Sequence, residues 1–141
     1  MHDEDRAATV ASEWVAKAEN DLTSAAHLVK LGRQCPTDSV CFHAQQVVEK
    51  YIKALLTVFA IPFPKTHDIR RLIELLPPTI ASQVSASDPD ELTNYATGAR
   101  YPGYAPIALR DTKLALKVAR RIRRDARKLL PARAKRKPQQ A

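Results

Sequence analysis

The stretch FHAQQVVEKYIKALL, Phe42–Leu56, decides the fold because its pattern is that of a helix with apolar side chains around most of its circumference. At 100° per residue, the apolar side chains of this region cover an arc of about 160°. An arc that wide must contact more than one neighbouring element, so we expect a central helix from about residue 38 to 60, ended by Pro62 and Pro64. A narrow polar stripe remains, formed by Gln46, Glu49, Lys50 and Lys53.

The flanking sequence predicts four further helices, at about residues 12–31, 66–76, 88–99 and 107–130. Their apolar residues recur every three or four positions. The sequence has only three glycines and no strong alternation of apolar and polar residues, and both facts favour helices over strands. The fold class expected is therefore all-α, an antiparallel bundle of four long helices plus a short one. The predicted N-caps are Ser12, Thr66 and Asp88.

Length and composition are those of one domain, with 141 residues and a net charge of +8. We expect disorder over residues 1–11, a bundle over 12–130 and a disordered basic tail over 131–141. No apolar run approaches the roughly 18 residues of a membrane span, and the acidic start lacks a signal region, which predicts a cytoplasmic protein without membrane contact. Cys35 and Cys41 lack metal-ligand partners at useful spacing, so no metal site is expected. Glycine-rich phosphate loops are also missing, and no cofactor is expected.

The charge is unevenly distributed. From Arg110 to the end there are thirteen Lys/Arg and two Asp, a net of +11, while residues 1–109 hold ten Lys/Arg and thirteen Asp/Glu, a net of −3. The basic last helix and tail are consistent with a solvated face or with a nucleic-acid-binding module that contacts phosphates.

Three positions suggest chemistry, and each has a structural alternative. Lys53 in the stripe is suited to hold a phosphate in a groove, or it forms an ordinary ion pair with Glu49 on a partly solvated edge. Arg100 ends a predicted helix just before a loop with two tyrosines, so its guanidinium is suited to phosphate and Tyr101 to stacking; the alternative is a helix cap. His67 is either a local hydrogen-bonding group or a proton carrier.

Four stretches occur in order along the chain: Trp14–Leu22 (WVAKAENDL), Phe42–Leu56, Thr66–Ile69 (THDI) and Ala99–Pro102 (ARYP). Together they resemble the HEPN family, the higher-eukaryote and prokaryote nucleotide-binding helical domains. The resemblance covers about residues 12–129 and implies a bundle that often forms homodimers with a cleft between subunits. It also implies a separate nucleotidyltransferase as partner, in pairs that often look like toxin–antitoxin modules, and a nucleotide or RNA as ligand.

One departure from the family pattern affects the expected activity. Many members are metal-independent ribonucleases in which an Arg is followed after four to six residues by a His, the Arg stabilising phosphate charge and the His moving the proton. After Arg100 the corresponding positions are Ala105, Pro106 and Ile107, and no His follows His67. We therefore expect no catalytic residues by that route and a protein that binds a nucleotide or a nucleotidyltransferase.

Two alternatives remain open: a ribonuclease toxin that uses Arg100 with His67 or Tyr104 as proton carrier, and a nucleic-acid-binding module built on the last helix and tail. The predicted nucleotide-binding residues are Gln46, Glu49, Lys50, Lys53, His67, Arg100 and Tyr101.

Overall fold

The computed structural model is all-helical in the part of the chain that it describes, which confirms the expected fold class. The described residues are 3–84, 92–93, 102–103 and 105–136. The elements are α1 (Asp3–Val29), η1 (Gly32–Gln34), α2 (Thr37–Val58), α3 (Ile69–Leu75), α4 (Pro78–Val84), α6 (Leu109–Leu129) and η2 (Ala132–Lys135).

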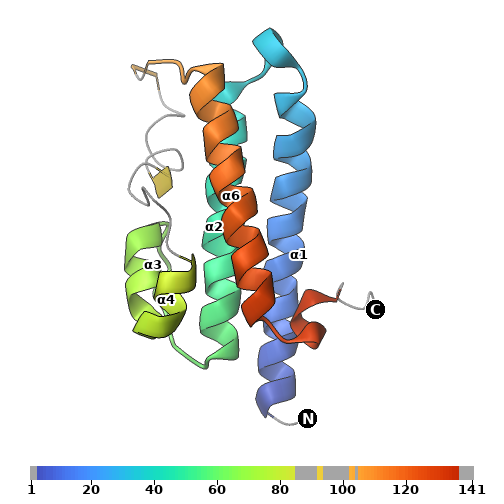
Figure 1. The fold of residues 1–141 in the computed structure, drawn as a ribbon, viewed down its shortest axis with the longest axis vertical. Coiled ribbons are helices and arrows are strands. Elements are labelled where there is room, and N and C mark those ends of the chain that lie inside the picture. Colours follow the sequence, from blue (N-terminus) through green and yellow to red (C-terminus); the bar gives the residue numbers. More distant parts are fainter. Residues whose placement is uncertain (1–2, 85–91, 94–101, 104, 137–141) are drawn as a thin grey trace.

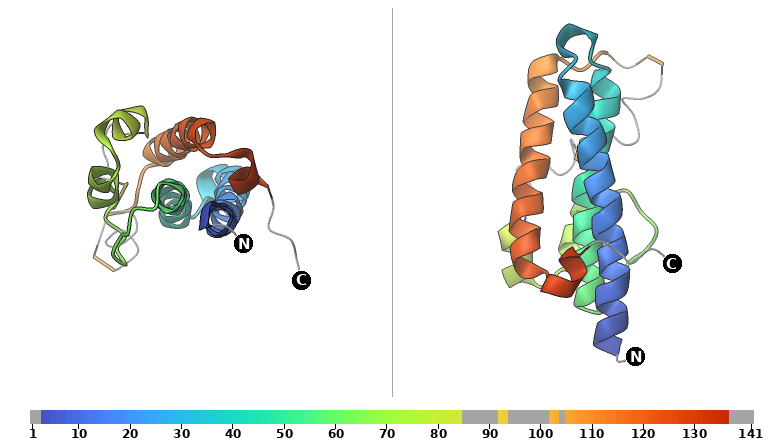
Figure 2. Two further views of the ribbon diagram at one scale, coloured as in Figure 1. Left: turned by 90° about the horizontal axis from the view of Figure 1, so that it is seen from below. Right: turned by 90° about the vertical axis from the view of Figure 1, so that its right-hand side faces the viewer.

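Three long helices form the body of the molecule: α1 runs antiparallel to α2 and α6, which run in the same direction (Figure 1). The view along the bundle places α2 between α1, α6 and the short pair α3–α4 (Figure 2, left). The central position of α2 follows from its wide apolar arc, and eight of its large side chains are fully buried. They are Val40, Gln45, Val47, Val48, Tyr51, Ile52, Leu55 and Leu56.

The N-terminal helix begins at Asp3 rather than near Ser12, so the expected disorder over residues 1–11 is wrong for residues 3–11. Asp3, Glu4 and Asp5 lie in the first turn, where negative charge is favourable near the positive end of the helix dipole. The apolar face also continues upstream, because Ala8 and Ala11 are buried. Ser12 is not an N-cap; its hydroxyl donates to the carbonyl of Thr9 at 2.6 Å within the helix.

The C-terminal segment also packs where disorder was expected. After α6, the short η2 lies beside α1 (Figure 2, right), and Ala134 is fully buried. Arg133 forms an ion pair with Asp5 in the first turn of α1. The prediction of a disordered tail is therefore wrong for residues 132–135, while residues 137–141 lie outside the described part.

Between α2 and α6 the predicted boundaries need two corrections. Asp68, rather than Thr66, caps α3, with its carboxylate accepting from the backbone N–H of Arg71 at 3.3 Å, so His67 precedes the helix. After α3, a second short helix begins at Pro78, which was not expected. A helix can begin there because a proline in the first turn loses no helical hydrogen bond. Of the predicted helix 88–99, the described residues are 92 and 93, both helical.

The helix α2 ends at Val58, close to the predicted end near residue 60, and the backbone conformation of Ala60 accompanies this end. Ala60 has a φ of 57°, the left-handed conformation that commonly terminates a helix. The N–H of Ile61 donates to the carbonyl of Leu56 at 2.9 Å, and that of Ala60 to Thr57 at 3.1 Å, which together satisfy two terminal carbonyls. The chain then turns into the segment 61–68, which covers one side of α2 and shapes the site described next.

In the described helices, length and apolar character fall short of what a bilayer crossing needs.

Candidate functional site

Three of the four residues in the polar stripe of α2 are buried. Gln46 is 7 % exposed, Glu49 2 % and Lys53 7 %, so the alternative of a partly solvated edge is wrong for these three side chains. Burying a charged group is costly unless it is paired and hydrogen-bonded. The arrangement of their partners therefore decides what the stripe can do.

Glu49 is the centre of this arrangement. Its carboxylate accepts a hydrogen bond from Lys53 Nζ at 3.1 Å, and His67 Nδ1 lies 2.8 Å from Oε1. The predicted Glu49–Lys53 pair is thus confirmed, although it is buried rather than exposed. Gln45, which sequence reasoning did not include, donates both to Glu49 and to the carbonyl of His67, each at 3.2 Å, and accepts from Gln46 at 2.6 Å.

Aromatic rings enclose the amino group of Lys53. Its Nζ lies 5.3 Å from the ring centre of Trp14 on α1 and 5.9 Å from that of Phe63 in the segment 61–68. The two rings are themselves 6.2 Å apart in a tilted arrangement. Attraction between a cation and aromatic faces adds to the ion pair with Glu49. Lys53 is therefore committed to contacts within this chain.

Asp21 on α1 forms a second centre on the same side of α2. Its carboxylate contacts Lys50 Nζ at 2.5 Å and His43 Nδ1 at 2.7 Å. Sequence reasoning missed Asp21, which is only 9 % exposed. Together these groups form a polar seam between α1 and the segment 61–68. We define the polar seam as Asp21, His43, Gln45, Gln46, Glu49, Lys50, Lys53 and His67.

His67 is the member of the polar seam that faces solvent most, with 63 % of its side chain exposed. In the neutral ring, the contact with Glu49 places the proton on Nδ1 and leaves Nε2 as an acceptor. The buried carboxylate thus orients an exposed imidazole, which can bind a ligand or move a proton through Nε2. Of the predicted site residues, the structure brings together Gln46, Glu49, Lys50, Lys53 and His67; Arg100 and Tyr101, like Tyr104, lie outside the described residues.

A third polar cluster connects α1, α2 and α6. Glu19 accepts from Arg123 Nε at 2.8 Å and Nη2 at 2.6 Å, and from the Tyr51 hydroxyl at 3.0 Å; Arg127 Nη1 donates to that hydroxyl at 3.1 Å. Burial alone would raise the pKa of Glu19, but the hydrogen bonds from Arg123 and Tyr51 outweigh it and lower the pKa. Burial raises the pKa of Tyr51.

Among the residues that the structure describes, no three His, Cys, Asp or Glu side chains are grouped so that they could hold a metal ion. Burial raises the pKa of the Cys41 thiol to about 11, so this cysteine is held in its neutral form near pH 7.

The helical fold and the order of the four sequence stretches named above both agree with one family. The chain belongs to the HEPN family, because the model of the HEPN domain matches residues 11–129. It is also similar in structure to ST0689, described as an archaeal HEPN homologue, at 26 % sequence identity and a TM-score of 0.64. That similarity covers 86 % of this chain and 98 % of the other. No curated protein matches the chain.

Proposed function

We propose that this HEPN protein binds a nucleotide at the polar seam and does not cleave RNA. The observation that supports the binding site best is the buried Glu49, which holds the exposed His67 at 2.8 Å in a fixed orientation. A ligand-binding side chain loses less conformational freedom on binding when its orientation is already set by neighbouring contacts. His67 therefore offers a pre-oriented hydrogen-bonding group at the surface.

The members of the polar seam divide into two roles in this proposal. His67, and Lys50 with 19 % of its side chain exposed, contact the nucleotide. Gln46, Glu49 and Lys53 are satisfied by one another and by Gln45, so they act as positioning residues.

The nucleotide also needs groups for its phosphate and its base. Arg100 supplies a planar guanidinium and Tyr101 an aromatic ring, the residue types that suit a phosphate and a base. The absence of His at positions 105–107 supports binding without cleavage, because the usual partner for proton transfer is missing there.

The ribonuclease alternative is favoured by one contact. A carboxylate that holds Nδ1 of a histidine and leaves Nε2 free to exchange a proton is the arrangement used by many general bases. Glu49 and His67 have this arrangement, and Arg100 would stabilise the phosphate charge. This alternative predicts that both Arg100 and His67 are essential for RNA cleavage.

The assembly we propose follows from the family. Its members often form homodimers and associate with a separate nucleotidyltransferase, sometimes as a toxin–antitoxin module. We propose the same associations for this chain, in the cytoplasm. Light scattering on the purified protein measures the first association, and co-expression of the chain with the neighbouring reading frame, followed by copurification, measures the second. A monomer that copurifies with no nucleotidyltransferase would contradict this assembly.

Thermal unfolding with a panel of nucleotides tests the binding site. A ligand at 100 times its dissociation constant stabilises the fold by about 2.7 kcal/mol, which raises the melting temperature of a domain of this size by roughly 5–10 °C. We expect this rise in the wild type and its loss in His67→Ala and Arg100→Ala. The matched controls are His27→Ala and Arg33→Ala, which replace exposed residues at the other end of the bundle, in and after the last turns of α1.

Two results would overturn the proposal. If no nucleotide shifts the melting temperature of the wild type, the binding function is wrong. If the purified wild type degrades RNA and both His67→Ala and Arg100→Ala abolish the cleavage, the protein is a ribonuclease and the non-cleaving assignment is wrong.

A further inference from the structure

The outer face of α6 carries a dense positive charge. Residues 109–129 contain nine Lys/Arg and two Asp. Seven of these cations are exposed, whereas Asp111 and Asp125 lie to one side of the face they form. We define the α6 basic face as the exposed residues Arg110, Lys113, Lys117, Arg120, Arg121, Arg124 and Lys128.

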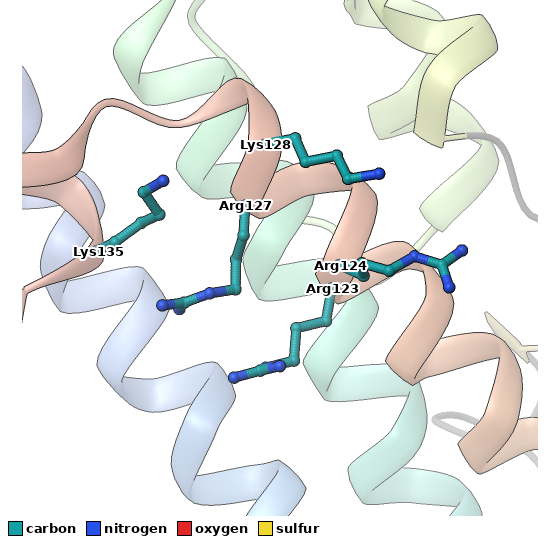
Figure 3. A pocket seen from close by; sticks show the side chains of 5 residues that line it. All are labelled: Arg123, Arg124, Arg127, Lys128 and Lys135. Atoms are coloured by element: carbon teal, nitrogen blue, oxygen red, sulfur yellow. The ribbon is translucent and has the colours of Figure 1, made fainter.

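Two adjoining hollows follow this face. One has a volume of about 610 Å³ and is lined by four cations and two apolar residues, namely Lys117, Arg120, Arg121, Arg124, Leu114 and Val118. The other, of about 360 Å³, lies between the end of α6 and η2 and is lined by Arg123, Arg124, Arg127, Lys128 and Lys135 (Figure 3). Arg124 lines both hollows, so the positively charged surface is continuous from one to the other.

Part of the second hollow is held in place by the cluster around Glu19. Figure 3 shows Arg123 and Arg127 pointing toward α1, with Lys135 approaching from η2, while Arg124 and Lys128 point to the opposite side of α6. Hydrogen bonds to Glu19 and Tyr51 orient the two arginines, and Asp125 pairs with Arg124 at 3.4 Å. These two carboxylates cannot neutralise five cations. The hollow therefore keeps an excess of positive charge with two pre-oriented guanidinium groups.

The dimensions and chemistry of the face suit a chain of phosphates. From residue 113 to 128 the helix rises by about 22 Å at 1.5 Å per residue. A nucleic-acid strand in a duplex carries one phosphate every 3.4 Å of axis, so several phosphates lie within that length. A lipid surface is the poorer match, because most of the apolar side of α6 is buried in the bundle, with Ala119, Ile122 and Ala126 fully inaccessible. Leu114 is the exception, since it is exposed beside the basic residues.

We infer that the α6 basic face, with the hollow between α6 and η2, is a binding site for the phosphate backbone of a nucleic-acid strand. This site is separate from the polar seam and does not depend on the nucleotide proposed there. Its contacts are with phosphates, so it binds with little regard to base sequence and with a strong dependence on salt.

Fluorescence anisotropy with a labelled 20-nucleotide single strand tests this site. The variant is Arg124→Gln with Lys128→Gln and Lys135→Gln, which leaves Arg123 and Arg127 on their partners. The matched control removes three exposed charges elsewhere, by Lys17→Gln, Lys30→Gln and Lys65→Gln, and reaches the same net charge. Each protein is titrated between 50 and 300 mM salt, and its circular-dichroism melting curve confirms folding.

We expect a steep salt dependence for the wild type. The triple variant loses roughly 100-fold in affinity at 50 mM salt, and the slope of log affinity against log salt falls by about 2, since each neutralised phosphate contributes about 0.7 for a single strand. The control variant keeps both the affinity and the slope of the wild type to within about threefold and about 0.7 unit. The titration is carried out with an RNA strand and with a DNA strand of the same sequence, which shows whether the site binds one or both. Binding of either strand, with the salt dependence and the loss in the triple variant given above, supports the site.

Three results would overturn the inference. If the protein binds neither strand, or if its affinity does not change with salt, the proposed phosphate contacts are wrong. An equal loss in the control variant shows attraction to net charge alone. Displacement of the strand by poly-glutamate or tripolyphosphate at the same concentration of negative charge shows a general anion site rather than one for a phosphate chain.

Discussion

The polar seam of α2 and the α6 basic face use the same kinds of charged residue in opposite ways. In the polar seam Glu49 and Lys53 are buried, and each has its partner within the chain. On the α6 basic face the cations are exposed and outnumber the nearby carboxylates. The difference shows that burial, rather than charge itself, separates groups that hold the fold from groups available to a ligand.

Glu49→Ala breaks the polar seam and has the largest expected effect. Removal of the carboxylate leaves Lys53 buried without a counter-ion, a change that typically costs about 3–5 kcal/mol of stability. Urea unfolding followed by circular dichroism measures this loss. As a control, Glu74→Ala removes an exposed carboxylate of α3 and changes the free energy of unfolding by less than about 0.5 kcal/mol.

A double substitution sharpens this test. Glu49→Leu combined with Lys53→Met replaces the buried ion pair by apolar side chains, which is often neutral or stabilising. We expect the double variant to unfold within about 1 kcal/mol of the wild type. A loss below 1 kcal/mol in Glu49→Ala would show that water screens the polar seam and that the two regions do not differ as described.

The cluster around Glu19 lies between the two regions, and its pH dependence has an intermediate effect. Because the folded protein lowers the pKa of Glu19, its stabilising contribution is fully present above the ordinary value of 4.5 and is lost as the pH falls through the lowered value. The difference in stability between wild type and Glu19→Gln therefore shrinks from pH 7 to pH 3. Urea unfolding at both values measures it.

The control for this experiment is Glu13→Gln, which replaces an exposed carboxylate of the same helix. Its difference from the wild type stays within about 0.5 kcal/mol at both pH values. A difference between wild type and Glu19→Gln that is equal at pH 7 and pH 3 would contradict the role assigned to the contacts with Arg123 and Tyr51.

Lys117→Gln gives the smallest expected effect and tests the α6 basic face. Lys117 lies one turn from Lys113, Arg120 and Arg121, so its removal relieves repulsion between like charges and stabilises the fold by about 0.2–0.5 kcal/mol. The gain disappears at high salt, which screens exposed charges. Melting temperatures at 20 mM and 500 mM salt measure both effects, with Lys30→Gln as control. A destabilisation of more than 1 kcal/mol would show that Lys117 is part of the fold.

Local periodicity was sufficient to predict the central helix, because the apolar arc of α2 is a property of one segment. The Glu49–Lys53 pair was predictable for the same reason, since the two residues are one turn apart. Asp21 was missed although its position three residues after Ala18 and four before Ala25 places it on the inner face of α1. A carboxylate on an apolar face is a sign of a buried ion pair.

Contacts between distant segments could not be derived from spacing. Glu19 and Arg123 are 104 residues apart, and no pattern in either helix indicates that they meet. The burial of the polar stripe depends on Phe63 and the rest of the segment 61–68. This segment is neither helix nor strand, so its sequence has no periodic pattern that would predict its position over α2. The early start of α1 was missed because its inward alanines are small, and the burial of Ala8 and Ala11 depends on neighbours from elsewhere in the chain.

The pairing of the two ends of the chain has a consequence during synthesis on the ribosome. The partners of α1 include Arg123 and Arg133, which are translated after α2, α3 and α4. At 5–20 residues per second, the 104 residues between Glu19 and Arg123 take about 5 to 20 s to translate. During that interval the side of α1 that contacts α6 and η2 remains exposed. The bundle is complete only when α6 and η2 have left the exit tunnel.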